Sequence, residues 1–192
     1  MHRFTVTANC ILHPHSIHRP TEVNKAPLQK GIYGWLFTPG SLPVPDAPYA
    51  HTDGFELMYV GIAPKRPGTN GKESASRLRP RLTAHSQRDA SRSTLRLTLG
   101  VLLAEELSLS LGLHKGRLNW GTDGEARLTR WIVSNARVAW AENPTPWDVE
   151  DELLAHATLA LNIDGRTDAF SRELKDRRDQ ARSAARIAST RF

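Results

Sequence analysis

The sequence predicts an α/β fold in which a small, mainly antiparallel sheet of three strands is flanked by helices. Three short apolar segments, each bounded by proline, glycine or polar residues, predict the strands, and several longer segments repeat apolar residues at the helical period. The chain has 192 residues, 39% of them hydrophobic and 24% charged. This size and composition are those of an ordinary folded domain with room for appended segments.

The predicted strands are residues 31–37 (GIYGWLF), 56–62 (ELMYVGI) and 136–142 (ARVAWAE). Pro39 and Gly40 follow the first strand, and Pro64 follows the second. The loop between them, residues 41–53, contains three prolines, which predicts an irregular connection and not a tight turn. Because consecutive strands are usually neighbours in a sheet, we expect these two to pair antiparallel.

Four helices are predicted between the second strand and residue 162. One begins at about Arg79 or Pro80, since proline is tolerated in a first helical turn. The leucine-rich segment 91–112 alternates in part like a strand, but its remainder favours a helix. Thr122 and Glu125 have the spacing of a capping box, which predicts a helix over about 123–135. Thr145 and Pro146 then predict the start of a helix whose apolar positions recur as far as Leu161.

The sequence divides into three parts. Residues 1–30 read as an N-terminal arm, residues 31–165 as the folded domain, and residues 166–192 as a C-terminal segment with a basic helix over 169–186. The arm contains histidines at positions 13, 15 and 18, which in such a polar context are more often solvated than bound to metal.

Charge and cysteine usage narrow the function classes. The net charge is +6, and residues 65–96 hold nine Lys and Arg against two acidic residues, which favours a polyanionic partner such as nucleic acid. A single cysteine, Cys10, excludes an intrachain disulfide. No stretch approaches the roughly 18 apolar residues of a membrane span. We therefore expect a cytoplasmic protein without a membrane partner.

Several polar or charged residues occur at positions where an apolar core residue would be expected. Tyr33 and Tyr59 lie on predicted strands, Arg81 and His85 are one helical turn apart, and Glu150 shares a helix face with leucines. Each residue alone has a structural explanation, because strand tyrosines usually pack and surface arginines are usually solvated.

The order of these residues resembles that of the GIY-YIG nucleases. GIY at 31–33 and YVG at 59–61 match the two signature strands of the family. The family continues with a helical arginine, often followed four residues later by histidine, then a metal-binding glutamate and an asparagine. Here Arg81, His85, Glu150 and Asn162 match. The separation of Tyr59 and Arg81 resembles the longer restriction-endonuclease members, and Ile62 stands where some relatives have lysine, for which Lys65 is a candidate substitute.

This resemblance implies a metal-dependent endonuclease that hydrolyses DNA with one metal ion. The long spacing favours a restriction or defence role over one in excision repair, and a homing or mobile-element nuclease stays open. Glu150 is the implied Mg²⁺ ligand, with Mn²⁺ as a substitute and Asp148 and Asp151 as alternative ligands. Glu152 is two residues from Glu150, or about 200° around a helix, and should point away. Tyr33 would activate water, with His85 as the alternative base. Arg81 would stabilise the transition state, and Tyr59 and Asn162 would orient the site.

DNA is the expected partner, and a homodimer would be the simplest way to cut both strands. A catalytically inactive nucleic-acid-binding module on the same fold is the alternative function. The residues expected to contact the DNA backbone are Lys65, Arg66, Lys72, Arg77, Arg79 and Arg88.

Overall fold

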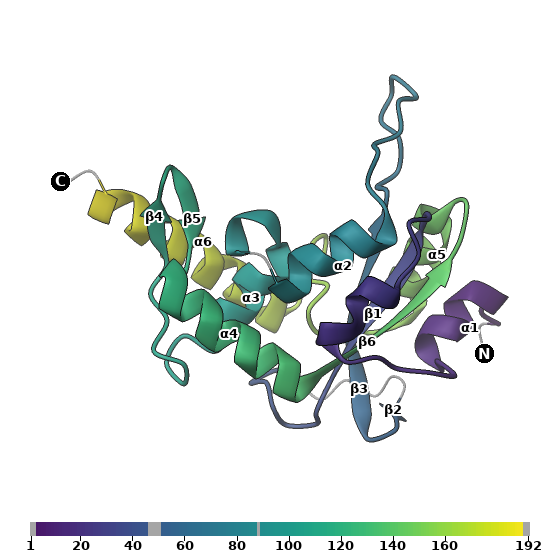
Figure 1. The fold of residues 1–192 in the computed structure, drawn as a ribbon, viewed down its shortest axis with the longest axis horizontal. Helices are drawn as coiled ribbons and strands as arrows, with labels where there is room; N and C mark the ends of the chain where they lie inside the picture. Colours follow the sequence, from purple (N-terminus) through teal and green to yellow (C-terminus); the bar gives the residue numbers. More distant parts are fainter. Residues whose placement is uncertain (1–2, 46–50, 88, 190–192) are drawn as a thin grey trace.

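A computed structural model describes residues 3–45, 51–87 and 89–189, and confirms the α/β fold. Its elements along the chain are α1 (Val6–Leu12), η1 (Pro20–Lys25), β1 (Gly31–Phe37), β2 (His51–Thr52), β3 (Phe55–Ala63), α2 (Leu78–Gln87), η2 (Ala90–Arg92), α3 (Thr94–Leu102), β4 (Gly112–His114), β5 (Arg117–Asn119), α4 (Gly121–Asn135), β6 (Ala136–Glu142), α5 (Pro146–His156) and α6 (Ala169–Ser189). Figure 1 shows their arrangement. No helix among these residues is long and apolar enough to cross a membrane.

The sheet contains the three predicted strands, β3, β1 and β6, all antiparallel, with β1 in the middle. The two-residue β2 adds a short edge strand to β3. In this register Tyr33 lies opposite Gly61 on β3 and Trp140 on β6. The two signature segments are therefore paired neighbours.

Strand β1 is buried along its whole length because helices cover both faces of the sheet. Its side chains alternate, as strand geometry requires. Tyr33, Trp35 and Phe37 belong to the core formed with α2, α3, α4 and α6. Ile32 and Leu36 belong to a second core formed with α1 and α5. A strand buried on both faces reads as an uninterrupted apolar run, and this explains the GIYGWLF segment.

Gly61 gives Tyr33 room in the sheet. A Cβ at position 61 would lie 2.5 Å from the Tyr33 hydroxyl oxygen and 2.7 Å from Cζ. Any side chain there would displace the phenol. The glycine of the second motif is thus a steric requirement of the tyrosine of the first.

Residues 3–30, which belong to the predicted arm, pack on the domain. Helix α1 buries Ala8, Ile11 and Leu12 in the second core. His18 then exchanges backbone hydrogen bonds with Val138 on β6, and its ring stacks on Trp140 at 4.2 Å between centroids. Helix α1 has only 7 residues, too few for a clear helical repeat of apolar positions. The strand that His18 pairs with, β6, is more than 100 residues away in the sequence, so the sequence gives no local sign of this contact.

Helix α4 begins at Gly121, and the predicted capping box of Thr122 and Glu125 is wrong. The Glu125 carboxylate accepts the N–H groups of Trp120 at 3.2 Å and Ala90 at 2.8 Å. It also binds the guanidinium of Arg96, which is 0% exposed, at 2.6 Å. Glu125 therefore ties the start of α4 to η2 and α3.

Two features before and after α4 also depart from prediction. The β4–β5 hairpin was not predicted; its turn residues Lys115 and Gly116 both have positive φ, as a type I′ turn requires. Helix α5 ends at His156 and does not reach Leu161. The Leu161 N–H instead donates to the Met58 carbonyl, so the chain there follows the edge of β3.

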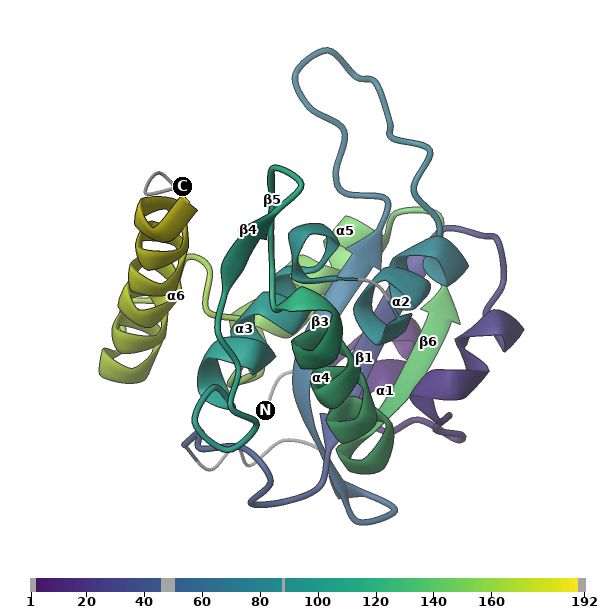
Figure 2. The same ribbon diagram turned by 60° about the vertical axis from the view of Figure 1, so that its left-hand side comes forward.

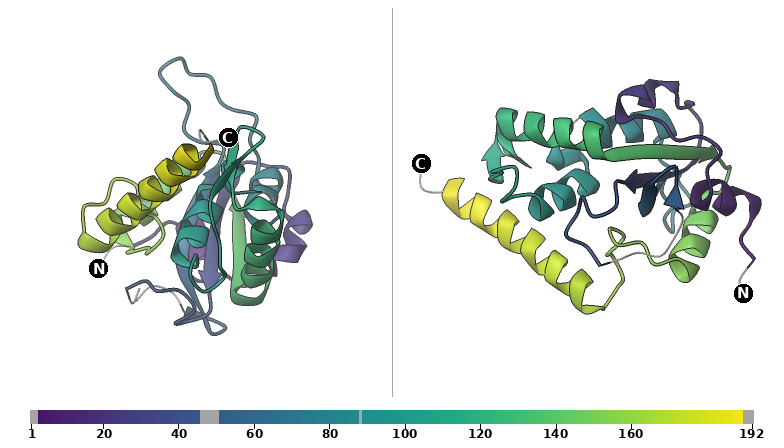
Figure 3. Two further views of the ribbon diagram at one scale, coloured as in Figure 1. Left: turned by 90° about the vertical axis from the view of Figure 1, so that its left-hand side faces the viewer. Right: turned by 90° about the horizontal axis from the view of Figure 1, so that it is seen from below.

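Helix α6 is docked on the domain and lies at the opposite end of the molecule from α1 (Figure 3). Leu174 and Ala185 are buried in the first core, and Arg177 donates to the Val101 carbonyl at 3.0 Å. Its C-terminal part lies beside the β4–β5 hairpin (Figure 1, Figure 2).

Candidate active site

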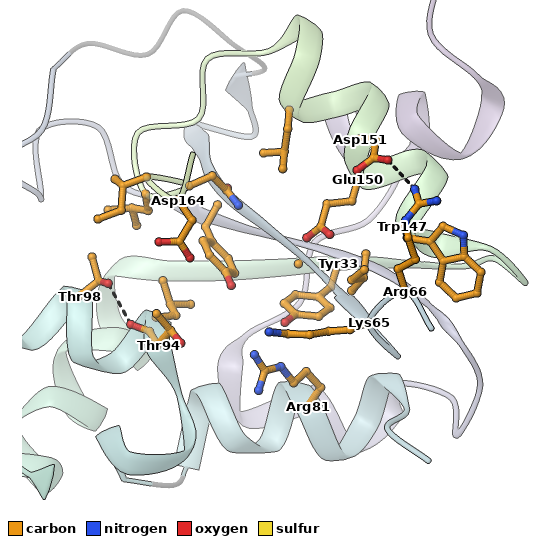
Figure 4. Close-up of a pocket in the computed structure, with 18 of the residues that line it drawn as sticks. Tyr33, Lys65, Arg66, Arg81, Thr94, Thr98, Trp147, Glu150, Asp151 and Asp164 are labelled. Carbon is orange, nitrogen blue, oxygen red and sulfur yellow. Dashed lines mark hydrogen bonds and ion pairs between the residues drawn. The ribbon is translucent and has the colours of Figure 1, made fainter. Parts of the chain in front are cut away.

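A cleft of about 440 Å³ lies where the two tyrosine strands meet α2, α3, α5 and α6. Five of the six predicted catalytic residues line it: Tyr33, Tyr59, Arg81, Glu150 and Asn162. In Figure 4, Glu150 reaches into the cleft from α5, and Tyr33 and Arg81 face it from β1 and α2. Residues separated by up to 129 positions are thus brought to one place by the sheet and the helices on it.

The sixth residue, His85, lies behind Tyr33 and does not line the cleft. Its side chain is 0% exposed, and its Nε2 lies 2.8 Å from the Tyr33 hydroxyl. Its Nδ1 lies 2.6 Å from Ser93 Oγ, which also accepts the Arg96 backbone N–H at the start of α3. His85 therefore lies behind the two tyrosines of the cleft: it is hydrogen-bonded to Tyr33, and its ring meets that of Tyr59 edge-on at 6.0 Å between centroids.

Burial sets the protonation of this buried pair. It raises the pKa of Tyr33 well above its ordinary value, the neighbouring Tyr59 adds to the rise, and Arg81 opposes it. Burial likewise lowers the pKa of His85 well below its ordinary value, reinforced by the positive charges of Arg81 and Arg96. The resting site therefore holds a neutral phenol hydrogen-bonded to a neutral imidazole.

Tyr59 and Arg81 complete the polar wall beside Tyr33. The rings of Tyr33 and Tyr59 lie 6.5 Å apart between centroids. Burial raises the pKa of Tyr59 to about 12, although the positive charge of Arg81 opposes the rise. The pKa of Arg81 is also raised, because the two tyrosines and Glu150 outweigh the effect of burial. Arg81 remains a cation in the cleft.

Glu150 is the acidic residue that best fits a metal ion. Its carboxylate has no hydrogen-bond or ion-pair partner among the described residues, and burial raises its pKa to about 7, with Asp151 adding to the rise. A half-buried carboxylate without a bound cation is disfavoured as the anion, and a divalent ion would restore it. One carboxylate with waters and phosphate oxygens is a usual Mg²⁺ environment.

The neighbouring acids of α5 have partners within the protein. Arg66 binds Asp151 at 2.5 Å and Asp148 at 3.4 Å. Glu152 accepts the backbone N–H and the hydroxyl of Thr5 at 2.9 and 2.6 Å, on the side of α1. Glu152 thus points away from the cleft, as predicted from its position on the helix.

Asn162 holds the strand that carries Tyr59. Its Oδ1 accepts the Val60 N–H at 2.8 Å, and its Nδ2 donates to the Val60 carbonyl at 2.9 Å. The amide thereby satisfies both backbone groups at this edge of β3, as a neighbouring strand would. Asn162 fixes the position of β3 beside the cleft.

The predicted DNA-contact residues differ in their surroundings. Lys65 lines the cleft, and Lys72 is exposed in the loop between β3 and α2, which projects from the body of the molecule (Figure 2). Arg77 lies 3.8 Å from Glu73, and Arg79 donates to the Ala26 carbonyl at 2.7 Å. Together with Arg66, these two arginines are engaged within the protein. Arg88 lies outside the described residues.

Sequence reasoning missed Arg178 and Asp164 as cleft residues. Both line the cleft, and their side chains approach to 4.0 Å. Arg178 is 8% exposed, its Nε has no hydrogen-bond partner among the described residues, and burial lowers its pKa. In the sequence, Arg178 is one of several arginines of a charge-rich helix, and only its spacing from Arg182 and Arg186 marks it out.

Comparison with known proteins gives one match. The family model of the GIY-YIG catalytic domain matches residues 31–183. Searches of curated proteins and of solved structures found no match. The matched range contains the whole cleft and most of α6.

Proposed function

Since this chain belongs to the GIY-YIG nuclease family, we propose that it is an endonuclease that hydrolyses DNA phosphodiester bonds with one bound Mg²⁺ ion. The observation that carries the proposal is the convergence of Tyr33, Arg81 and Glu150 on one cleft from three separate elements. Phosphodiester hydrolysis needs a proton acceptor for water, positive charge near the phosphate and help for the leaving oxygen.

Glu150 would hold the metal ion, and Mn²⁺ could replace Mg²⁺ because both accept oxygen ligands. The bound ion would supply positive charge to the non-bridging phosphate oxygens. No three His, Cys, Asp or Glu residues form a metal-binding group in the described part of the chain. The donor set therefore favours one ion held by one carboxylate.

Tyr33 would take the proton of the attacking water. A standing phenolate is disfavoured because burial raises the Tyr33 pKa. The 2.8 Å hydrogen bond to His85 Nε2 offers another route, in which Tyr33 passes its own proton to His85 as it accepts one from water. Because the His85 pKa is lowered, this imidazolium would be short-lived and would return its proton quickly. In that step the His85 Nδ1–H would be donated to Ser93 Oγ. His85 acts in this scheme through Tyr33 and not on water directly.

Arg81 would stabilise negative charge on the phosphoryl oxygens. Its guanidinium is a fixed cation with several donors, which suits a phosphate better than a lysine ammonium does. Lys65 adds a second positive charge at the cleft. Tyr59 would orient the phosphate or the water, and Asn162 would hold Tyr59 in place through β3.

The biological role we propose is restriction-like or defence-like, and the residue spacing between Tyr59 and Arg81 supports it. A symmetric dimer would let one cleft per chain cut each strand. The catalytic unit in this proposal is the domain of residues 31–165, with the basic C-terminal segment attached to it.

Cleavage assays test the proposal. Supercoiled plasmid and single-stranded DNA are incubated with wild type, Glu150→Gln and Asp148→Asn, in Mg²⁺, in Mn²⁺ and in chelator. The proposal predicts metal-dependent cutting by wild type and Asp148→Asn, and its loss in Glu150→Gln. Asp148 is an exposed acid on the same helix, so it controls for charge removal and purification. DNA binding without cutting by wild type on a library of sequences would favour the inactive binding module.

A further inference from the structure

A second, strongly basic groove continues from the catalytic cleft. It is bounded by η2, the start of α3, the β4–β5 hairpin and α6, and it shares Lys65, Arg81 and Thr94 with the cleft. Arg92, Arg117, Arg182 and Arg186 also line it, and no acidic residue does. Its positive charges come from residues 65–92, from the β4–β5 hairpin and from α6, which are distant in sequence.

Helix α6 carries a row of arginines that links the two spaces. Arg178, Arg182 and Arg186 recur every four residues and so share one face of the helix. Arg178 lines the catalytic cleft, and Arg182 and Arg186 line the groove. The acidic residues of α6 lie at positions 173, 176 and 179, and none follows. The positive charge of the row is therefore balanced by fewer acidic residues at the end of α6 that is farther from the cleft.

These arginines are available to a ligand. The guanidinium groups of Arg92, Arg117 and Arg186 make no hydrogen bond or ion pair within the described part of the chain, whereas Arg182 binds the exposed Asp179 at 2.8 Å. Arg178, more than nine-tenths buried, has an unpartnered Nε and faces the cleft. A buried unpaired donor is costly, and an anionic group in the cleft would satisfy it.

We propose that the row Arg178, Arg182 and Arg186, with Arg92 and Arg117 across the groove, binds the phosphate backbone of the DNA strand that enters the catalytic cleft. This inference rests on the proposed nuclease function. At 1.5 Å per residue, the row extends about 12 Å along the helix, which equals the axial rise of roughly three to four nucleotides of one strand at about 3.4 Å each. The β4–β5 hairpin and α6 form the walls of the DNA site.

Binding measurements test the groove separately from catalysis. The affinity of Glu150→Gln protein for a short labelled DNA duplex is measured in chelator between about 50 and about 200 mM KCl. The groove variant adds Arg182→Gln and Arg186→Gln. The control variant adds Arg130→Gln and Arg172→Gln, which remove the same charge from exposed positions outside the groove. A third variant, Arg92→Gln with Arg117→Gln, tests the opposite wall without changing α6.

Loss of two phosphate contacts should lower the slope of log affinity against log salt by about 1.8, and weaken binding at the lower salt at least tenfold. The Arg92→Gln and Arg117→Gln variant should show the same losses, and the control variant should bind DNA as the Glu150→Gln protein does. Groove variants that match the control would overturn the inference even if the wild-type protein cuts DNA. If the groove variants bind DNA more weakly but the wild-type protein cuts no DNA, the result would support the groove and contradict the nuclease function. Thermal unfolding of each variant checks that α6 remains docked.

Discussion

The buried ion pair between Arg96 and Glu125 gives the sharpest stability prediction. Arg96 is 0% exposed, and its guanidinium donates to the Glu125 carboxylate, the Glu125 carbonyl and Thr129, with longer contacts to the His85 and Ser86 carbonyls. Glu125→Gln keeps the shape of the side chain, and its amide oxygen can still accept the Ala90 and Trp120 N–H groups. The amide nitrogen then replaces Oε2, so the substitution removes the charge that compensates Arg96 and places an N–H donor opposite two guanidinium donors.

Leaving a buried charge unpaired costs about 3–5 kcal/mol. At about 2.1 cal/mol/K per residue, a chain of 192 residues has an unfolding entropy of roughly 400 cal/mol/K, so Tm should fall by about 7–12 °C. Circular dichroism melts of Glu125→Gln and of Asp123→Asn, an exposed acid on the same helix, measure this difference. The double variant Arg96→Met with Glu125→Gln removes the buried charge and keeps an acceptor for the Ala90 and Trp120 N–H groups, so it should recover much of the loss. A Glu125→Gln protein that melts within about 2 °C of wild type would refute the argument.

Three further predictions concern the site. His85 is neutral in the folded protein but titrates near 6.5 in the unfolded chain, so the unfolded state binds more protons below that pH. The free energy of unfolding should therefore fall as pH drops below 6.5, by up to about 1.4 kcal/mol per pH unit. In urea unfolding, His85→Gln in a Glu150→Gln background should show a smaller change of stability with pH. The Glu150 pKa of about 7 means that protons compete with the metal, so calorimetry should show Mg²⁺ affinity rising up to about tenfold per pH unit below 7 and levelling above it; affinity independent of pH would exclude Glu150 as the ligand. Gly61→Ala places a methyl group against the Tyr33 hydroxyl and should cost about 1–3 kcal/mol and most of the cleavage activity, whereas unchanged melting and cleavage would show that the phenol is free to shift.

The strands and most of the helices were predictable because their signals are local. GIYGWLF and ARVAWAE are apolar runs between clear breakers, and β1 and β6 have the predicted bounds. Helix α1 and the β4–β5 hairpin were missed because each is short and is stabilised by contacts with distant segments. The end of α5 was placed too late, since the apolar residues up to Leu161 pack on β3 and not along a helix.

The candidate site was predictable in its members but not in their geometry. The order of Tyr33, Arg81, Glu150 and Asn162 gave the residues of the cleft. Sequence could not show that His85 lies behind Tyr33, because only the packing of α2 on the sheet places it there. Nor could it show which arginines are already bound within the protein. Within residues 65–96, Arg66, Arg77 and Arg79 are engaged inside the protein, while Lys65, Arg81 and Arg92 line a groove together with arginines of α6.

The single-turnover cleavage rate of Tyr33→Phe, measured beside its DNA affinity, tests most directly whether this cleft is the hydrolytic site. The substitution removes only the hydroxyl that contacts His85 and leaves the ring in its buried position. We predict unchanged DNA affinity and a rate at least about 100-fold lower, the usual contribution of a general base. Cleavage by Tyr33→Phe at the wild-type rate, in a preparation whose Glu150→Gln counterpart is inactive, would contradict this account.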